Sequence, residues 1–142
     1  MSTQTNVQQG AIVVVAGEDL SSKEGYLVEL YNDAGTAKAR VPTSNDVQQL
    51  YLLDDDGESG ANVTLLPLES GKSFRIEFEG TGAIGDIVVL ADTAVAGDRG
   101  KVRELPTAAG TYRGLGWLEE AAVDGQQALV RCSPQGNVTV TE

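Results

Sequence analysis

Histidine is absent from this sequence, and cysteine occurs once, at Cys132. The chain therefore lacks the commonest general base and the commonest metal ligand of proteins. A lone cysteine cannot form a disulfide within the chain, and no histidine is present to activate its thiol as a nucleophile. The 21 acidic residues offer many carboxylate pairs, but no spacing singles one out as catalytic. We expect no catalytic residue, no metal site and no cofactor, and predict that the protein is not an enzyme.

Basic residues are few, since ten Lys and Arg stand against 21 Asp and Glu, for a net charge of −11. Phosphate backbones repel such a chain, so we expect no nucleic-acid partner. Long hydrophobic runs are also missing, because none approaches the ~18 residues that cross a membrane. Residues 1–9 and the short run AIVVVA after them do not form a secretory signal. We expect a soluble protein, made in the cytoplasm and without a membrane partner.

Aromatic residues make up only 5% of the chain, so a core must come mainly from Val, Leu, Ile and Ala. Short apolar runs recur along the sequence, and turn-forming stretches rich in Gly, Asp and Asn separate them. These runs cover 11–16, 26–31, 50–53, 63–68, 74–78, 86–90, 101–105, 112–118, 127–132 and 137–141. The pattern predicts an all-β protein: a compact β-sandwich or small β-barrel of about 8–10 short strands.

Local patterns refine this prediction. In FRIEF (74–78), Phe74, Ile76 and Phe78 alternate with polar residues, as in a half-buried strand. Helix is predicted only as one or two short turns, one before a strand that starts near Leu50 and one within 91–98. The length of 142 residues suggests one domain, which we place at 11–142. Residues 1–10 are polar and are predicted to form a flexible, extended N-terminal arm.

The stretch GTYRGLGWLEEAAVDGQQALVRC (110–132) contains the only tryptophan. LEEAA alone would suit a helix, but two glycines precede it and Asp124-Gly125 is a strong hairpin signal. We predict a strand, a turn and a second strand, with Glu119 and Glu120 on opposite faces and therefore not a cooperating pair. Trp117 is either an anchor of the core or a contact at a subunit interface, where tryptophan is enriched.

Three segments together resemble a small β-rich family of bacteriophage capsid decoration, or cement, proteins. They are GEDLSSKEGYLVEL (17–30), GAIGDIVVLAD (82–92) and AAGTYRGLGWLEEAAVDGQQALVRC (108–132), and they follow a polar N-terminal arm. The resemblance is strongest over 82–132 and weaker over 10–30, while 32–80 looks like an insertion. The family has no catalytic residues to carry over.

The resemblance implies a structural virion protein that is made in the host cytoplasm and binds the exterior of an icosahedral head. Its partner would be the major capsid protein, and copies would form a homotrimer that bridges capsid subunits and stabilises the expanded shell. We expect Thr3, Thr5 and Val7 to contact the capsid, and Leu115 and Trp117 to serve subunit packing. The alternative is another β-rich virion part, such as a head-fibre base, a tail-tube protein or an adhesin-like module.

Overall fold

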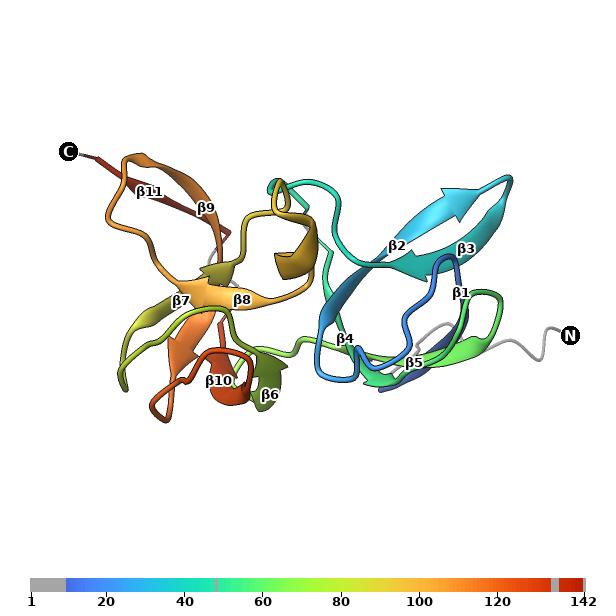
Figure 1. Cartoon of the computed structure of the whole chain (residues 1–142), viewed down its shortest axis with the longest axis horizontal. Helices are drawn as coiled ribbons and strands as arrows, with labels where there is room; N and C mark the ends of the chain where they lie inside the picture. The colour runs from blue at the N-terminus through green and yellow to red at the C-terminus, as the bar shows by residue number, and fades with distance from the viewer. Residues whose placement is uncertain (1–9, 48, 134–135, 142) are drawn as a thin grey trace, which may run out of the picture.

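The computed structural model describes residues 10–47, 49–133 and 136–141, and shows two β-sheets side by side along the long axis (Figure 1). The first sheet is a closed barrel formed by the first half of the chain, and the second sheet follows it. The barrel strands are β1 (Ile12–Ala16), β2 (Leu27–Asp33), β3 (Thr36–Arg40), β4 (Tyr51–Asp55) and β5 (Asn62–Pro67). The second sheet has β6 (Ser73–Glu77), β7 (Ile87–Leu90), β8 (Val102–Glu104), β9 (Gly110–Leu118), β10 (Gln127–Cys132) and β11 (Asn137–Val140).

The barrel closes because β1 pairs on both of its sides. It runs parallel to β3 and antiparallel to β5, which gives the strand order β1-β3-β2-β4-β5 around the ring. Its interior is filled by small and medium aliphatic side chains, among them Val28, Leu53, Val63 and Leu65, all fully buried. This core suits a chain with few aromatics, since a narrow barrel leaves room only for close-packed side chains.

The second sheet has the order β6-β10-β9-β7-β8, and β11 pairs with the first half of β9. Its inner face is packed against the outside of the barrel. Leu27 and Leu52 of the barrel share one apolar cluster with Ile76, Phe78 and Val130 of the sheet. Consecutive residues of β2, and likewise of β4, are therefore both buried. Leu27 and Leu52 face the second sheet, while Val28 and Leu53 face the barrel interior.

The prediction of an all-β fold with short strands and a small barrel is confirmed. Each of the ten predicted runs contains or overlaps a strand, and the short helical turn predicted within 91–98 is a 3-10 turn at Ala96–Asp98. The predictions missed β3, whose sequence TAKAR has few β-branched residues. Of the predicted arm, residues 1–9 lie outside the part of the chain that the structure describes.

A β-bulge in β9 decides which side chains of this strand reach the surface. Val88 lies opposite Gly116 and Val89 lies opposite Gly114, so Leu115 is the extra residue. The bulge interrupts the alternation, with the result that Leu115 packs into the core while Trp117 is exposed. Gly116 has a φ of +149°, and a Cβ built there would lie 1.9 Å from the carbonyl oxygen of Arg131.

Candidate protein-binding site

The structure separates the two residues that were predicted to serve subunit packing. Leu115 is 5% exposed and belongs to the apolar cluster between barrel and sheet. Trp117 is 40% exposed, so it is not an anchor of the core of this chain, and its predicted role at an interface stays a prediction. The predicted capsid contacts Thr3, Thr5 and Val7 lie outside the described residues.

Trp117 stands in the middle of a row of side chains that crosses the outer face of the second sheet. Ile87 and Arg131 are its direct neighbours on β7 and β10, and side chains of directly paired residues share a face. Leu105, which donates its N–H to the carbonyl of Ile87, continues the row on one side, and Ser73, paired with Arg131, ends it on the other. We call these five residues the outer row.

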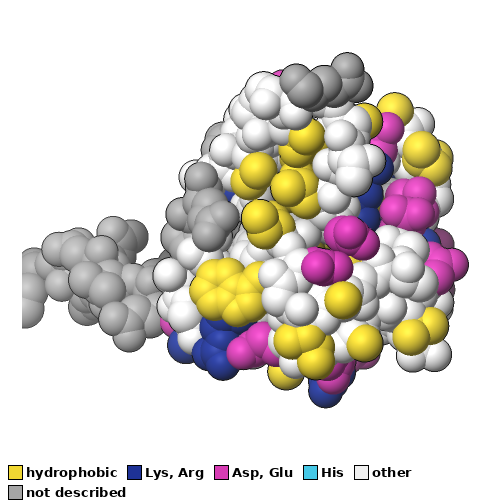
Figure 2. All heavy atoms as spheres, turned by 90° about the vertical axis from the view of Figure 1, so that its left-hand side faces the viewer, with side chains coloured by type: hydrophobic (Ala, Val, Ile, Leu, Met, Phe, Trp, Pro, Cys, Tyr) yellow, Lys and Arg dark blue, Asp and Glu magenta, His cyan; other side chains and the backbone are white. Residues whose placement is uncertain are grey.

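The outer row is apolar at one end and charged at the other. Ile87 is 40% exposed, and Ile84, in the loop before β7, is 71% exposed. Figure 2 looks onto the end of the molecule that the second sheet forms, and on this face hydrophobic side chains gather near the middle, with acidic and basic side chains around them. An apolar patch with a polar rim, held on a rigid sheet, is typical of a protein-binding surface.

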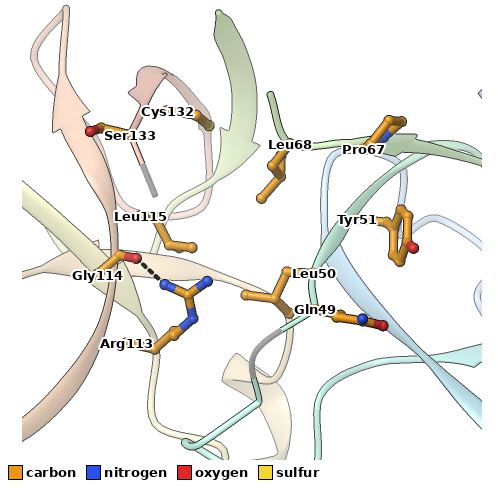
Figure 3. A pocket seen from close by; sticks show the side chains of 10 residues that line it. All are labelled: Gln49, Leu50, Tyr51, Pro67, Leu68, Arg113, Gly114, Leu115, Cys132 and Ser133. Carbon is orange, nitrogen blue, oxygen red and sulfur yellow. Dashed lines mark hydrogen bonds between the residues drawn. The ribbon is translucent and has the colours of Figure 1, made fainter. Parts of the chain in front are cut away.

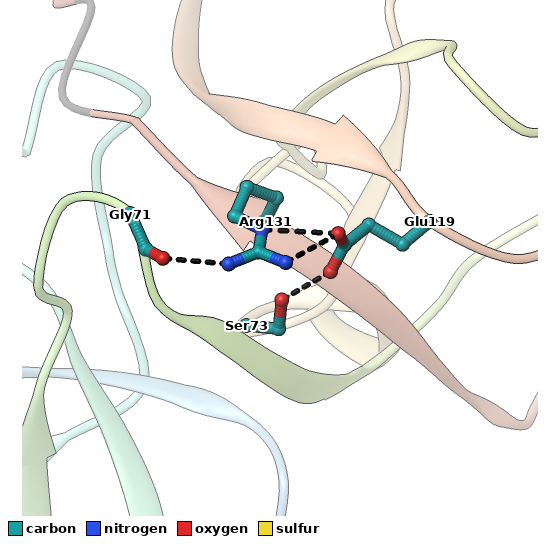
Figure 4. Close-up of polar contacts among 4 residues, drawn as sticks. All are labelled: Gly71, Ser73, Glu119 and Arg131. Carbon is teal, nitrogen blue, oxygen red and sulfur yellow. Dashed lines mark hydrogen bonds and ion pairs between the residues drawn. The ribbon is translucent and has the colours of Figure 1, made fainter.

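A hydrogen-bonded network fixes the charged end of the row (Figure 4). Arg131 donates from Nε and Nη2 to Oε2 of Glu119, at 3.0 and 2.7 Å, and from Nη1 to the carbonyl of Gly71 at 2.7 Å. The Ser73 hydroxyl donates to the other carboxylate oxygen of Glu119. The hydrogen bonds from Ser73 and Arg131 lower the pKa of Glu119 below its ordinary value. The network therefore holds the guanidinium beside Trp117 in one orientation.

The prediction that Glu119 and Glu120 lie on opposite faces is wrong. Glu120 accepts hydrogen bonds from Arg75 Nη1 at 2.6 Å and from the N–H of Leu129 at 3.1 Å, and Glu119 reaches Ser73 and Arg131. Ser73 and Arg75 are two residues apart on β6 and so share a face. Strand β9 ends at Leu118, and the alternation rule does not apply beyond it. Each carboxylate is paired with an arginine, as in cross-strand ion pairs.

The lowered pKa of Glu119 gives a prediction for acid stability. Its carboxylate stabilises the fold above the ordinary glutamate pKa of 4.5, and this contribution is lost as the pH falls through the lower pKa of the folded state. Glu119→Gln should therefore be less stable than the native chain near neutral pH, and the difference should shrink as the pH is lowered below 4.5. Urea unfolding at a series of pH values measures this.

Glu58→Gln is the control for that experiment, since it removes one charge from an exposed position in the loop between β4 and β5. A difference in stability between Glu119→Gln and the native chain that does not shrink as the pH is lowered below 4.5 would contradict the network as described.

A groove of about 290 Å³ lies between the barrel and the second sheet (Figure 3). Its walls include Leu50, Leu68 and Leu115, and Arg113 extends along it while donating to the carbonyl of Gly114 at 2.6 Å. Cys132 also lines the groove, and burial raises the pKa of its thiol to about 11. The thiol is therefore protonated at neutral pH, which makes it a poor nucleophile.

Within the described ranges, no three His, Cys, Asp or Glu side chains are grouped in a way that could hold a metal ion. In the same ranges, no helix has the length and hydropathy needed to cross a bilayer.

Sequence reasoning missed Arg131, Ser73 and Ile87 as neighbours of Trp117. Only the strand order β6-β10-β9-β7 brings these residues together, and a sequence pattern does not contain that order.

Comparison with known proteins adds no assignment, since the chain matches no protein-family model and no curated protein.

Proposed function

We propose that this protein binds the outer surface of an icosahedral phage head and stabilises the expanded capsid by bridging its subunits. Two lines support the proposal. The first is the resemblance of segments 17–30, 82–92 and 108–132 to capsid decoration proteins. The second, which carries the binding role, is the exposure of Trp117 at the centre of an ordered sheet face. We further propose that the protein has no catalytic activity and acts as part of the virion exterior.

The outer row has the composition of a contact between proteins. Tryptophan and arginine dominate the binding energy of interfaces when neighbouring groups hold them in place. Trp117 is flanked by Ile87 on one side and on the other by Arg131, whose orientation the Glu119 network fixes. We propose that the outer row joins copies of the chain into a homotrimer with closed cyclic symmetry.

Because the shell repeats the same subunit many times, a weak contact from each copy would be sufficient for tight binding of the assembly to the head. Each copy in a trimer adds its capsid contact to those of the other two, so the assembly binds more tightly than one copy alone. If the protein binds the expanded shell and not its precursor, it stabilises the expanded state by mass action. The net charge of −11 would leave the decorated particles repelling one another.

Heating of phage heads tests the stabilising role. Expanded, undecorated heads are mixed with saturating protein, and the temperature at which the shell opens is followed by dye access to the packaged DNA. We expect a rise of several degrees, since ligand binding to one state raises its stability with concentration. Heads that open at the same temperature with and without bound protein would contradict stabilisation and favour another β-rich virion part.

A further inference from the structure

Strand β6 forms one edge of the second sheet, and its free side opens into a slot beside the barrel. The slot has a volume of about 280 Å³. The residues that line it include Ser73, Phe74 and Arg75 of β6, Leu52 and Asp54 of β4, and Glu24. We call this feature the β6 slot.

The hydrogen-bond pattern of β6 shows which main-chain groups face the slot. Phe78 donates its N–H to Gln126, and Lys72 accepts from the N–H of Cys132, so the even-numbered residues bond with β10 and the segments that flank it. In an antiparallel pair the main-chain groups of the alternate residues point the other way. The N–H and C=O groups of Ser73 and Arg75 are therefore directed into the β6 slot.

One end of this edge is already closed by the chain itself. Glu77, the next odd-numbered residue, donates its N–H to the carbonyl of Gly25 at 2.9 Å. Gln127 holds the same corner by donating to the carbonyl of Glu24 at 3.0 Å. The open edge is thus a short stretch with a defined end, which fixes the register of any strand added to it.

The side chains around the β6 slot favour a positively charged partner. Glu24 and Asp54 are exposed at the slot, and the charge of Arg75 is compensated by Glu120 at 2.6 Å. Phe74, which is half-buried at the slot, supplies apolar surface against which the aliphatic stem of a lysine or arginine can pack. The whole chain carries a charge of −11, which attracts the same kind of segment.

We propose that the β6 slot binds an extended segment of the capsid protein as an added strand, and that this segment carries a lysine or arginine. The inference rests on the proposed function for the identity of the partner, and on the open edge and the acidic side chains for its chemistry. Main-chain hydrogen bonds to Ser73 and Arg75 would supply affinity, and the pairing of the cation with Glu24 and Asp54 would supply selectivity.

Two substitutions at one position isolate the main-chain contact. Arg75→Pro removes the N–H that faces the slot and leaves the hydrogen bonds to β10 in place, since proline is tolerated on an open edge. Arg75→Thr removes the same side chain and the same ion pair but keeps the N–H. We expect the proline variant to pellet with expanded heads about tenfold more weakly than the threonine variant. Equal pelleting of the two would overturn the inference and leave the proposed function intact.

If the native chain does not pellet with heads, the proposed function is wrong. A peptide titration then still tests whether the β6 slot binds an extended, positively charged segment. The probe is the acetylated, amidated peptide TVTKTVT, and its control is TVTETVT. We expect the lysine peptide to bind about fivefold more tightly or better at low salt, and to slow hydrogen exchange at Ser73 and Arg75. Equal binding of the two peptides, or protection only at other strands, would overturn the inference.

The double substitution Glu24→Gln and Asp54→Asn gives a second readout that does not disturb the strand, should Arg75→Pro fail to fold. It should remove the preference for the lysine peptide and leave the thermal unfolding of the chain nearly unchanged, because both side chains are exposed. A preference for lysine that persists in this variant would contradict the assigned role of the two acids.

Discussion

Gly116→Ala should destabilise the protein by about 3 kcal/mol or more, which is a large part of the stability of a typical domain. A Cβ at this position would lie 1.9 Å from the carbonyl oxygen of Arg131, and the neighbouring atoms are also backbone. No rotamer change can relieve that contact, so strands β9 and β10 would have to separate. The φ of +149° adds strain, because side-chain-bearing residues rarely adopt it.

Urea unfolding of Gly116→Ala beside Gly97→Ala measures this effect. Gly97 has open space around its Cβ position and no positive φ, so its substitution should change stability by less than about 0.5 kcal/mol. A Gly116→Ala variant as stable as Gly97→Ala would contradict the close approach of β9 and β10 at the bulge. It would then also question the placement of Trp117 on the outer face.

Trp117→Glu should weaken binding to expanded heads by about tenfold or more, and cross-linking on the heads should no longer give trimers. The substitution places a charge in the apolar half of the outer row, beside Ile87. Stability should fall much less than with a core substitution, because 40% of the tryptophan is exposed in the single chain. Sedimentation with heads, followed by cross-linking, measures both effects.

Val13→Glu is the matched control for Trp117→Glu. Val13 is 65% exposed on β1 of the barrel, toward the opposite end of the long axis from β9 (Figure 1). The Val13→Glu variant should pellet with heads like the native chain. If the two variants bind heads equally and give the same amount of cross-linked trimer, the outer row is not the contact between copies.

The strands of this fold could be predicted because the sequence marks them locally. FRIEF shows the alternation of a half-buried strand, and the structure places Ile76 and Phe78 in the core as expected. Strand β3 was missed because the alanines and the lysine of TAKAR have low β-propensity. It forms because a two-residue turn at Ala34-Gly35, where both residues have positive φ, returns the chain along β2.

The candidate site could be predicted only in part, since its geometry depends on pairing between distant segments. Trp117 was identified as a possible interface residue, but its exposure results from a bulge opposite Val88 and Val89 that no local pattern indicates. The relation of Glu119 to Ser73 depends on contacts 46 residues apart in sequence. The sequence could not distinguish a barrel from a sandwich, because the barrel closes only through the long-range pairing of β1 with both β3 and β5.

Sedimentation of the native chain with expanded, undecorated heads of its own phage is the decisive experiment for the proposed role on the capsid. We expect saturable pelleting at protein concentrations on the order of micromolar, with a fixed number of copies per head. A variant that lacks residues 2–9 shows in the same experiment whether the predicted contacts Thr3, Thr5 and Val7 contribute. No pelleting of the native chain at such concentrations would contradict the claim that this protein is part of a phage head.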